Sequence, residues 1–289
     1  MSAIWIPRGP SHSDFSVAEP RVRVYDGPER DRRRGVSDME LARLTWPEAR
    51  EAIRTAGVAL SPVGAIEQHG PHLPLGTDAF IATRIASDVA RRDGRLLLPT
   101  IRIGVSGEHR QFWGTLTVTP DDLRDRAIAV ARSLASHGLR KLVFVNGHGS
   151  NAAPLEEAAR RLREEGTFAF AFNWWQSIAS TLEALFPDPT AHAGSIETSM
   201  MLAIDRALVR ADRFDDAGEV TDWGTYVEGV LVGFDAADFT EQGNVGDPRR
   251  ADREKGEAAL SAAVDSLGRF CDWLSARTDD ELAARPHRP

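Results

Sequence analysis

The sequence predicts an α/β fold, with one domain in which a parallel-rich β-sheet is sandwiched between helices. Short apolar runs typical of buried strands recur along the chain, and amphipathic helical patterns lie between them. Strands and helices that alternate at this spacing form parallel β-α-β units. The chain has 289 residues, of which 42% are hydrophobic. It is therefore long enough to bury a sizeable core in a single large domain.

The elements follow one another in a regular order. A short helix is expected within MELARLTWPEAREAI, and strands are expected at residues 57–64, 95–104, 141–147 and 167–173. The clearest helix covers residues 119–137, because Thr119 is a good N-cap candidate and Pro120 suits the first helical position. Its apolar face consists of Leu123, Ala127, Val130, Ala131 and Leu134. A later helix is expected to begin in IETSMMLAID.

Residues 1–37 differ in composition from the rest of the chain. The segment RVRVYDGPERDRRRG holds six arginines among turn formers and few large apolar residues. Such a composition buries too little apolar surface to form a core of its own. We expect an N-terminal arm that is either extended in solvent or packed on a neighbouring subunit, and a hydrolase domain across residues 38–289.

Composition excludes several classes of protein. A formal net charge of −8 argues against nucleic acid as a partner. Cys271 is the only cysteine, so there is neither an intrachain disulfide nor a thiolate cluster, which fits a cytoplasmic protein. No apolar run approaches the roughly 18 residues that would cross a membrane. The first residues also lack the pattern of a secretory signal.

Metal-capable side chains follow two of the predicted strands. Glu67, His69 and Asp78 lie in VGAIEQHGPHLPLGTDAF, after the first strand, and His148 lies in NGHGSN, after the third. Ligands of parallel sheets bind outside the carboxyl ends of strands, where loops lead into helices. We therefore expect these side chains to meet at one edge of the sheet.

A third cluster supplies further candidates. In HAGSIETS, His192 and Glu197 lie five residues apart where a loop enters a helix. Imidazole nitrogens and carboxylate oxygens without thiolates suit catalytic zinc, manganese or iron. The carboxylate of Asp78 could bridge two such ions.

Five sequence motifs together resemble the creatininase (creatinine amidohydrolase) family. They are PVGAIEQHGPHLPLGTD, SGEHRQFWGTLTV, NGHGSN, HAGSIETS and GNVGDPRRADREKGEA, which occur in the family's order and lie between about residues 55 and 265. The resemblance implies a single α/β domain, a centre of two divalent metal ions and a homo-oligomer, commonly a hexamer. It does not extend to the segment before residue 40.

The resemblance also implies a role for each metal-capable residue. Glu67 and His148 correspond to the terminal ligands of one ion. His69 and Glu197 correspond to ligands of the other ion, and Asp78 to the carboxylate that joins the two. His192 corresponds to a histidine close to the substrate.

This sequence departs from creatininase proper near the substrate. Creatininase proper has a glutamate ligand where this chain has Ser150, and an aromatic residue beside the substrate where this chain has Gly149. Its Trp-Asp pair ahead of the histidine corresponds here to Asp188 and Pro189. Creatinine is therefore a poor candidate substrate. Relatives with a glycine-rich version of the NGHGSN loop include formamide deformylases, peptidase-like maturases and hydrolases of cyclic ketones.

The function favoured is that of a metal-dependent amidohydrolase, which cleaves an amide, lactam or formamide bond of a small molecule rather than an ordinary peptide bond. Two divalent ions, with zinc favoured over manganese and iron, would make hydroxide available near neutral pH and polarise the scissile carbonyl. His192 is the candidate proton donor to the leaving nitrogen, since a histidine exchanges protons near pH 7 without a large pKa shift. Hydrolysis of a cyclic ketone, a peptidase-like maturase and a non-catalytic binding protein stay open as alternatives.

The remaining candidates surround the expected centre. Glu108 joins His192 as a catalytic candidate, because it is expected either to hydrogen-bond the metal ligands or to line the pocket. A purely structural polar role is the alternative. Trp174 and Trp175 belong either to the core or to a substrate wall. The candidate substrate-binding residues are His109, Trp113, Gly149, Ser150, Trp174, Trp175 and Asp188.

Overall fold

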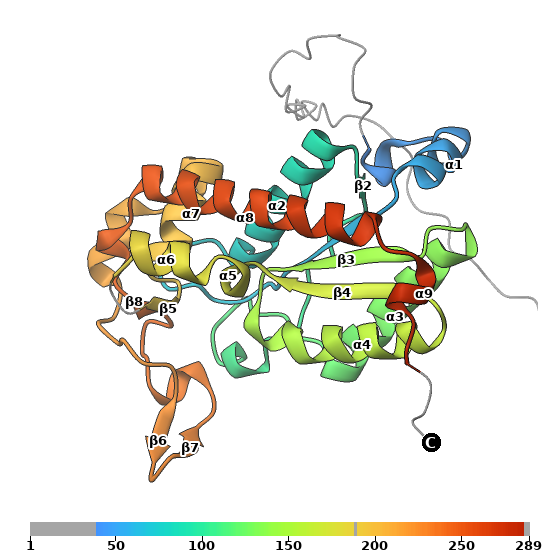
Figure 1. Cartoon of the computed structure of the whole chain (residues 1–289). Helices are drawn as coiled ribbons and strands as arrows, with labels where there is room; N and C mark the ends of the chain where they lie inside the picture. Colours follow the sequence, from blue (N-terminus) through green and yellow to red (C-terminus); the bar gives the residue numbers. More distant parts are fainter. Residues whose placement is uncertain (1–38, 188–189, 286–289) are drawn as a thin grey trace, which may run out of the picture. The chain divides into compact units, whose positions relative to one another are not determined.

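The computed structural model describes residues 39–187 and 190–285, and its central feature is a four-stranded parallel sheet (Figure 1). The strands are β1 (Ala59–Val63), β2 (Leu96–Leu97), β3 (Lys141–Asn146) and β4 (Phe168–Asn173). Their order across the sheet is β2-β1-β3-β4, and every neighbouring pair is parallel. The predicted α/β fold is confirmed. The predicted arm at residues 1–37 lies outside the described residues.

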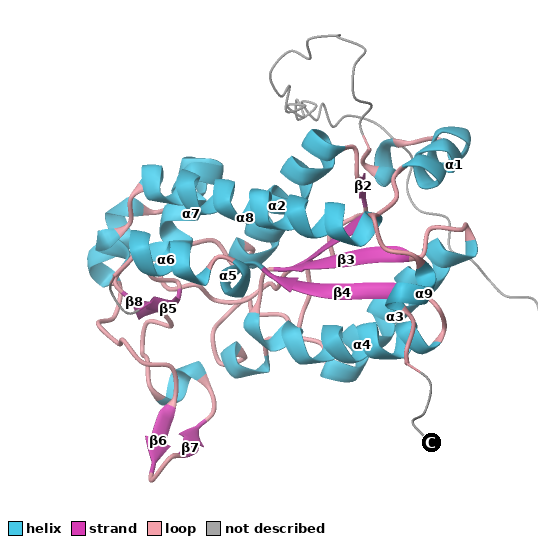
Figure 2. Cartoon of the chain, viewed as in Figure 1, coloured by secondary structure: helices cyan, strands magenta, loops and turns pink. Residues whose placement is uncertain are grey.

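Helices cover both faces of this sheet (Figure 1, Figure 2). The α-helices are α1 (Trp46–Thr55), α2 (Thr77–Asp93), α3 (Pro120–Ser136), α4 (Ala152–Glu164), α5 (Trp174–Ser177), α6 (Ala179–Leu185), α7 (Ser195–Asp205), α8 (Arg253–Ser275) and α9 (Asp279–Leu282). Short 3₁₀ helices occur at Leu41–Arg43, Gly107–His109, Gly149–Asn151, Arg206–Leu208, Ala211–Asp216, Ala236–Asp238 and Pro248–Arg250. Helices α2 and α8 cover one face of the sheet, α3 and α4 cover the other, and α7 packs against α8 and α2.

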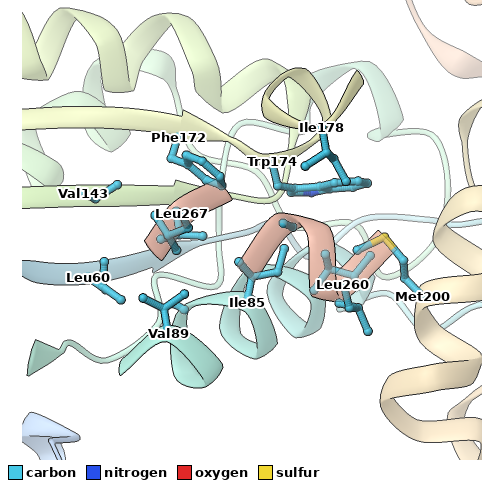
Figure 3. Close-up of a cluster of buried hydrophobic side chains, with 14 of the residues drawn as sticks. Leu60, Ile85, Val89, Val143, Phe172, Trp174, Ile178, Met200, Leu260 and Leu267 are labelled. Atoms are coloured by element: carbon cyan, nitrogen blue, oxygen red, sulfur yellow. The ribbon is translucent and has the colours of Figure 1, made fainter. Parts of the chain in front are cut away.

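An apolar core lies on each side of the sheet. Figure 3 shows part of the first core, in which Leu60 of β1 and Val143 of β3 lie near Ile85 of α2 and Leu267 of α8. The next residue of β3, Phe144, belongs to the second core, because successive side chains of a strand point to opposite faces. Every residue of β1 is buried, as expected of a parallel strand covered by helices on both faces.

Helix α3 forms as its sequence predicts. The Thr119 side chain accepts a hydrogen bond from the backbone N–H of Asp122 at 3.1 Å, and Asp122 in turn accepts one from the backbone N–H of Thr119 at 3.2 Å. This reciprocal capping satisfies N–H groups that a helix start leaves without partners. Of the predicted apolar face, Leu123 and Leu134 are buried. The cap and the buried face together fix where the helix begins and how it packs.

Strand β2 is much shorter than the predicted strand at residues 95–104. Regular pairing ends at Leu97, and Pro99 follows, which has no N–H to donate to a neighbouring strand. The chain still runs beside β1, because the N–H of Ile101 donates to the carbonyl of Pro62 at 2.9 Å. The segment therefore runs parallel to β1 as predicted, but the strand itself is shorter than predicted.

Two small antiparallel sheets complete the fold. Strand β5 (Thr190–His192) pairs with β8 (Val245–Gly246), and β6 (Thr225–Val227) pairs with β7 (Val230–Gly233). The β6–β7 hairpin projects from the other elements of its domain (Figure 2). Within residues 39–187 and 190–285, no helix combines the length and apolar character needed to cross a membrane.

The order of the strands positions a site. The connection from β1 to β2 contains α2 and crosses one face of the sheet, whereas the connection from β2 to β3 contains α3 and crosses the other. The strand order therefore reverses between β1 and β3. Ligands of open parallel sheets bind outside the carboxyl ends of strands at such a reversal.

Candidate metal centre

Two of the predicted metal-binding residues that follow β1 contact a third that follows β3. Nδ1 of His148 lies 3.1 Å from Oε1 of Glu67 and 3.3 Å from Oδ2 of Asp78. These contacts join the loop after β1, the first turn of α2 and the loop after β3. The two strand ends therefore meet as the sequence predicts.

The remaining predicted ligands complete a second group around the same aspartate. Nε2 of His69 lies 2.9 Å from Oδ1 of Asp78 and 3.9 Å from Oε2 of Glu197. One oxygen of Asp78 is thus directed to His148 and the other to His69. A carboxylate placed between two donor groups in this way is suited to bridging two cations.

Two glycines allow the strand ends to approach α2 this closely. A Cβ added at Gly147 would lie 2.3 Å from the backbone oxygen of Asp78, and one at Gly64 would lie 2.4 Å from the backbone of Ala79. Real Cβ atoms do not come so near to backbone atoms, so a larger residue at either position would push α2 away from the sheet. Glycine at these positions therefore brings Asp78 and His148 together.

A strained residue links His192 to Glu197. Ala193 has a φ of 51°, in the left-handed region that residues with a Cβ rarely occupy. Its N–H donates to Oε2 of Glu197 at 2.6 Å. Backbone strain of this kind is concentrated at functional sites, and here it turns the chain so that both side chains reach the cluster.

The carboxylates of the cluster leave oxygens without hydrogen bonds. Both side-chain oxygens of Glu67 and Oδ2 of Asp78 are buried and accept no hydrogen bond of good geometry from the described residues, although Nδ1 of His148 lies 3.1 Å from Oε1 of Glu67 and 3.3 Å from Oδ2 of Asp78. Burying several carboxylates together is costly, and proteins normally pair such charges or use them to bind a cation. These oxygens are therefore evidence for a cation site.

The pKa values show how strongly the cluster favours positive charge. Burial lowers the pKa of His69, but the negative charge of Asp78 and the hydrogen bond to it raise the pKa to about 10. Burial also lowers the pKa of His148, which Glu67 and Asp78 nevertheless raise well above its ordinary value. Burial raises the pKa of Glu197 to about 7. The clustered carboxylates thus create a strongly negative local field, which also attracts divalent cations.

The donor atoms fit two ions that share Asp78. Glu67, Asp78 and His148 form one group of donor atoms that lie within 4.8 Å of one another, and His69, Asp78 and Glu197 form a second. All are nitrogen or oxygen donors, which suits catalytic zinc, manganese or iron. A third group of the same kind contains Glu67, His69 and His192, so the geometry also permits His192 to act as a ligand.

His192 is held in one orientation by the loop after β1. Its Nε2–H donates to the backbone carbonyl of Gln68 at 2.8 Å, which leaves Nδ1 unprotonated and 3.8 Å from Oε1 of Glu67. Burial lowers the pKa of His192 well below its ordinary value, and the neighbouring His69 and His109 lower it further. The expectation that this histidine has an unshifted pKa was therefore wrong, because the side chain is buried among other histidines.

Glu108 lies on the other side of His148. Its Oε1 is 3.3 Å from Nε2 of His148 and accepts a hydrogen bond from the hydroxyl of Ser150. Burial raises the pKa of Glu108, but its contacts with His148 and Ser150 lower it to about 2. The same Nε2–H of His148 donates to the backbone carbonyl of Val105 at 2.7 Å. Carbonyls and carboxylates that contact the outer nitrogen of a metal-ligating histidine orient its ring, so Val105 and Glu108 are together placed to orient His148.

A cavity of about 630 Å³ opens beside the cluster. Of the predicted substrate-binding residues, the structure places in its lining His109, Gly149, Ser150, Trp174 and Trp175. Trp113 does not line it and is 98% exposed. Asp188 lies outside the described residues.

Several residues at the site were not predicted from the sequence. The Gln68 side chain donates to Nδ1 of His109 at 2.7 Å and to the carbonyl of Gly243 at 2.9 Å. Its position inside the motif EQHG was a signal that could have identified it. Trp223 and Phe234 also line the cavity, but they lie outside every motif, so no local pattern pointed to them.

The fold and the site together indicate one class of protein. Its members are parallel α/β proteins in which nitrogen and oxygen donors at the carboxyl edge of the sheet suit a hydrolytic metal centre. The family model for creatininase, described as creatinine amidohydrolase, matches residues 42–271. The chain belongs to the creatininase family. Membership makes it a hydrolase of the amidohydrolase class, and the ligand groups around Asp78 agree with the metal dependence of that family.

Individual relatives cover most of the chain. It is 36% identical over 249 residues to the mycofactocin precursor peptide peptidase of Mycobacterium ulcerans (strain Agy99), covering 83% of this chain and 90% of the relative. This chain is 33% identical over 245 residues to the creatinine amidohydrolase of Pseudomonas putida, and the match covers 78% of this chain and 92% of that relative. The solved structure "Creatininase Mn" aligns with a TM-score of 0.73 at 28% identity, covering 83% of this chain and 100% of that one.

Proposed function

We propose that this protein uses two divalent metal ions to hydrolyse an amide, lactam or formamide bond of a small molecule. The observation that carries the proposal is the pair of donor groups that share Asp78, with buried carboxylate oxygens that lack hydrogen bonds, beside a cavity of about 630 Å³. A cavity of this volume lies in the range of small-molecule sites.

Each candidate ligand has a proposed place. Glu67 and His148 would hold one ion, His69 and Glu197 the other, and Asp78 both. The ions would supply an activated water and would polarise the scissile carbonyl. Zinc is the favoured metal, with manganese and iron as alternatives, because the donor set contains nitrogen and oxygen only.

The residues around the ligands would position the substrate and move protons. His192 presents an unprotonated Nδ1 to the cluster, so it would first accept a proton and then deliver it to the leaving nitrogen. Gln68 holds the ring of His192 through its backbone carbonyl. Glu108 would keep the ring of His148 in a ligating orientation.

A peptide is the second candidate substrate. The supporting observation is the 36% identity to a mycofactocin precursor peptide peptidase over 83% of this chain. The same chemistry would serve to hydrolyse a peptide bond. Creatinine is disfavoured for this protein, since Gly149 and Ser150 replace the residues expected of creatininase proper.

A substrate panel tests the proposal. Protein loaded with Zn²⁺, Mn²⁺ or Fe²⁺ would be assayed against formamides, lactams, short peptides and cyclic ketones, with Asp78→Ala as the inactive control. Turnover of an amide or formamide that requires Asp78 supports the proposal. Turnover of cyclic ketones alone would show that the protein hydrolyses cyclic ketones and not amides. Full activity after complete metal removal would contradict the metal dependence.

We further propose a cytoplasmic homo-oligomer, most simply a hexamer. The support for the hexamer is the family resemblance. The support for the location is the single cysteine, Cys271, which is buried and so fits a reducing compartment. The arm at residues 1–37 is proposed to be either extended in solvent or packed on a neighbouring subunit. Deletion of the arm separates the two, because only a packed arm should change the mass of the assembly when it is removed.

A further inference from the structure

Trp223 forms part of the cavity wall and packs against two histidines of the site. Its ring centroid lies 5.4 Å from that of His109 and 5.8 Å from that of His192, in edge-to-face geometry. Phe239 packs on it in turn, at 5.1 Å. An aromatic side chain with these neighbours is held at a defined place beside the reacting groups.

The segment that carries Trp223 is anchored on both sides. Before it, Gly218 exchanges two hydrogen bonds with the side chain of the fully buried Asn244, at 2.8 and 2.9 Å. After it, Asp235, which is 8% exposed, accepts hydrogen bonds from Arg110 at 2.7 Å and from Gln111 at 2.5 Å. The first anchor lies before Trp223, and the second lies beyond the β6–β7 hairpin that follows it and joins the segment to the loop that carries Glu108 and His109.

The cavity combines aromatic walls with negative charge. Trp175, Trp223 and Phe234 contribute aromatic surface. Besides the carboxylates assigned to metal binding, Glu108 and Glu183 line the cavity, and no lysine or arginine occurs among the described residues of its lining. Aromatic faces attract apolar rings and cations. The side of the cavity away from the metal-binding residues is therefore suited to an aromatic group.

We propose that Trp223 is a specificity-determining residue, and that the cavity takes an amide whose neighbouring group is aromatic. The inference rests on the proposed function and narrows its substrate class. The scissile amide would lie at the metal-binding residues, and its aromatic neighbour would pack on Trp223. An aromatic ring that also carries a cation would gain a further attraction to Glu108 and the tryptophan faces.

Two small probes that do not need hydrolysis test this directly. Benzyltrimethylammonium and benzyl alcohol share a phenyl ring and differ in charge. Each would be titrated calorimetrically into metal-loaded protein. We expect the cation to bind about 10-fold more tightly than the alcohol, which is the scale of cation–π attraction to buried aromatic faces.

Variants then assign the effect to Trp223. Trp223→Ala should weaken binding of the cation about 10-fold, and Trp223→Phe should restore most of it, because the aromatic face is retained. Trp113→Ala is the matched control, since Trp113 is 98% exposed and does not line the cavity. Circular dichroism and metal analysis would show that the variants keep their fold and their ions.

The outcomes separate the inference from the proposed function. Unchanged affinity in Trp223→Ala, alcohol binding as tight as cation binding, or no measurable binding of the cation to the wild type would each overturn the inference. If the probes bind as expected but no amide in the substrate panel is cleaved, the proposed function fails while the assigned role of Trp223 in aromatic binding survives.

Discussion

Oδ2 of Asp78 lies 3.3 Å from Nδ1 of His148, although Asp78 lies in the first turn of α2 and His148 follows β3. The contact depends on the absence of a side chain at Gly147, where a Cβ would lie 2.3 Å from the backbone oxygen of Asp78. Because the other oxygen of Asp78 contacts His69, one aspartate connects both groups of candidate ligands.

The first prediction concerns this bridging position. Protein purified without chelator should carry about two divalent ions per chain, and Asp78→Ala should lose most of them, because each ion would lose a ligand. Elemental analysis of purified protein measures this. Asp88→Ala, in the same helix but away from the cluster, is the matched control. Full metal content in Asp78→Ala would remove the bridging role.

The second prediction concerns His192. His192→Ala should retain metal and fold but lose roughly 10²-fold or more in turnover, the usual contribution of a positioned acid or base. Turnover of a substrate found in the panel and metal content are measured together, with the exposed His137→Ala as control. Normal turnover would exclude His192 from the mechanism. Loss of metal along with activity would instead make it a ligand with Glu67 and His69.

The third prediction concerns Glu108. Glu108→Gln should weaken metal affinity by about 10- to 100-fold, because carboxylates that orient a ligating histidine usually contribute that much. Competition with a chelating dye measures the affinity. Ser150→Ala should have a smaller effect, since it removes only a hydrogen bond to Glu108. If metal affinity in Glu108→Gln equals that of the wild type, Glu108 does not act through His148.

The fourth prediction concerns Asp235. Asp235→Ala frees Arg110 and Gln111 and loosens the segment that carries Trp223, so KM should rise roughly 10-fold while kcat changes little, because the reacting groups stay in place. Steady-state kinetics on the active substrate separates the two constants. Asp212→Ala, on an exposed 3₁₀ helix, serves as control. A fall in kcat with unchanged KM would show that Asp235 supports the chemistry and not the substrate wall.

The fifth prediction concerns assembly. Light scattering should give a mass several times the 31.6 kDa of one chain, with about six chains expected. The basis is the resemblance to a family whose members commonly form hexamers. A single species at the mass of one chain would contradict it.

Much of the candidate site could be predicted because its ligands lie in short motifs at strand ends. Carboxyl ends of parallel strands share one edge of a sheet, so Glu67 and His148 could be expected to meet without knowledge of the strand order. Trp223 could not be placed in this way. Its position depends on the contacts of Asp235 with Arg110 and Gln111, which are far away in sequence and form no recognisable pattern.

Local chemistry explains the other differences between sequence and structure. The apolar run at residues 95–104 predicts a long strand, but Pro99 interrupts regular pairing. The φ of Ala193 is not encoded in its residue type, because alanine normally avoids that region. The pKa of His192 depends on burial among other histidines, which a sequence motif does not reveal. Trp113 lies in a motif, yet its side chain points to solvent in this chain.

The candidate ligands also bear on how the folded state is held together. Glu67, His69 and Asp78 come from one continuous stretch, whereas His148 and Glu197 come from distant parts of the chain. Ions held by all five would act as cross-links between these three segments, which restrict the unfolded chain most when the joined residues are far apart. Anything that binds only the folded state shifts the unfolding equilibrium according to its free concentration. If the ions bind as proposed, thermal stability of this protein should rise with the supply of free metal ions.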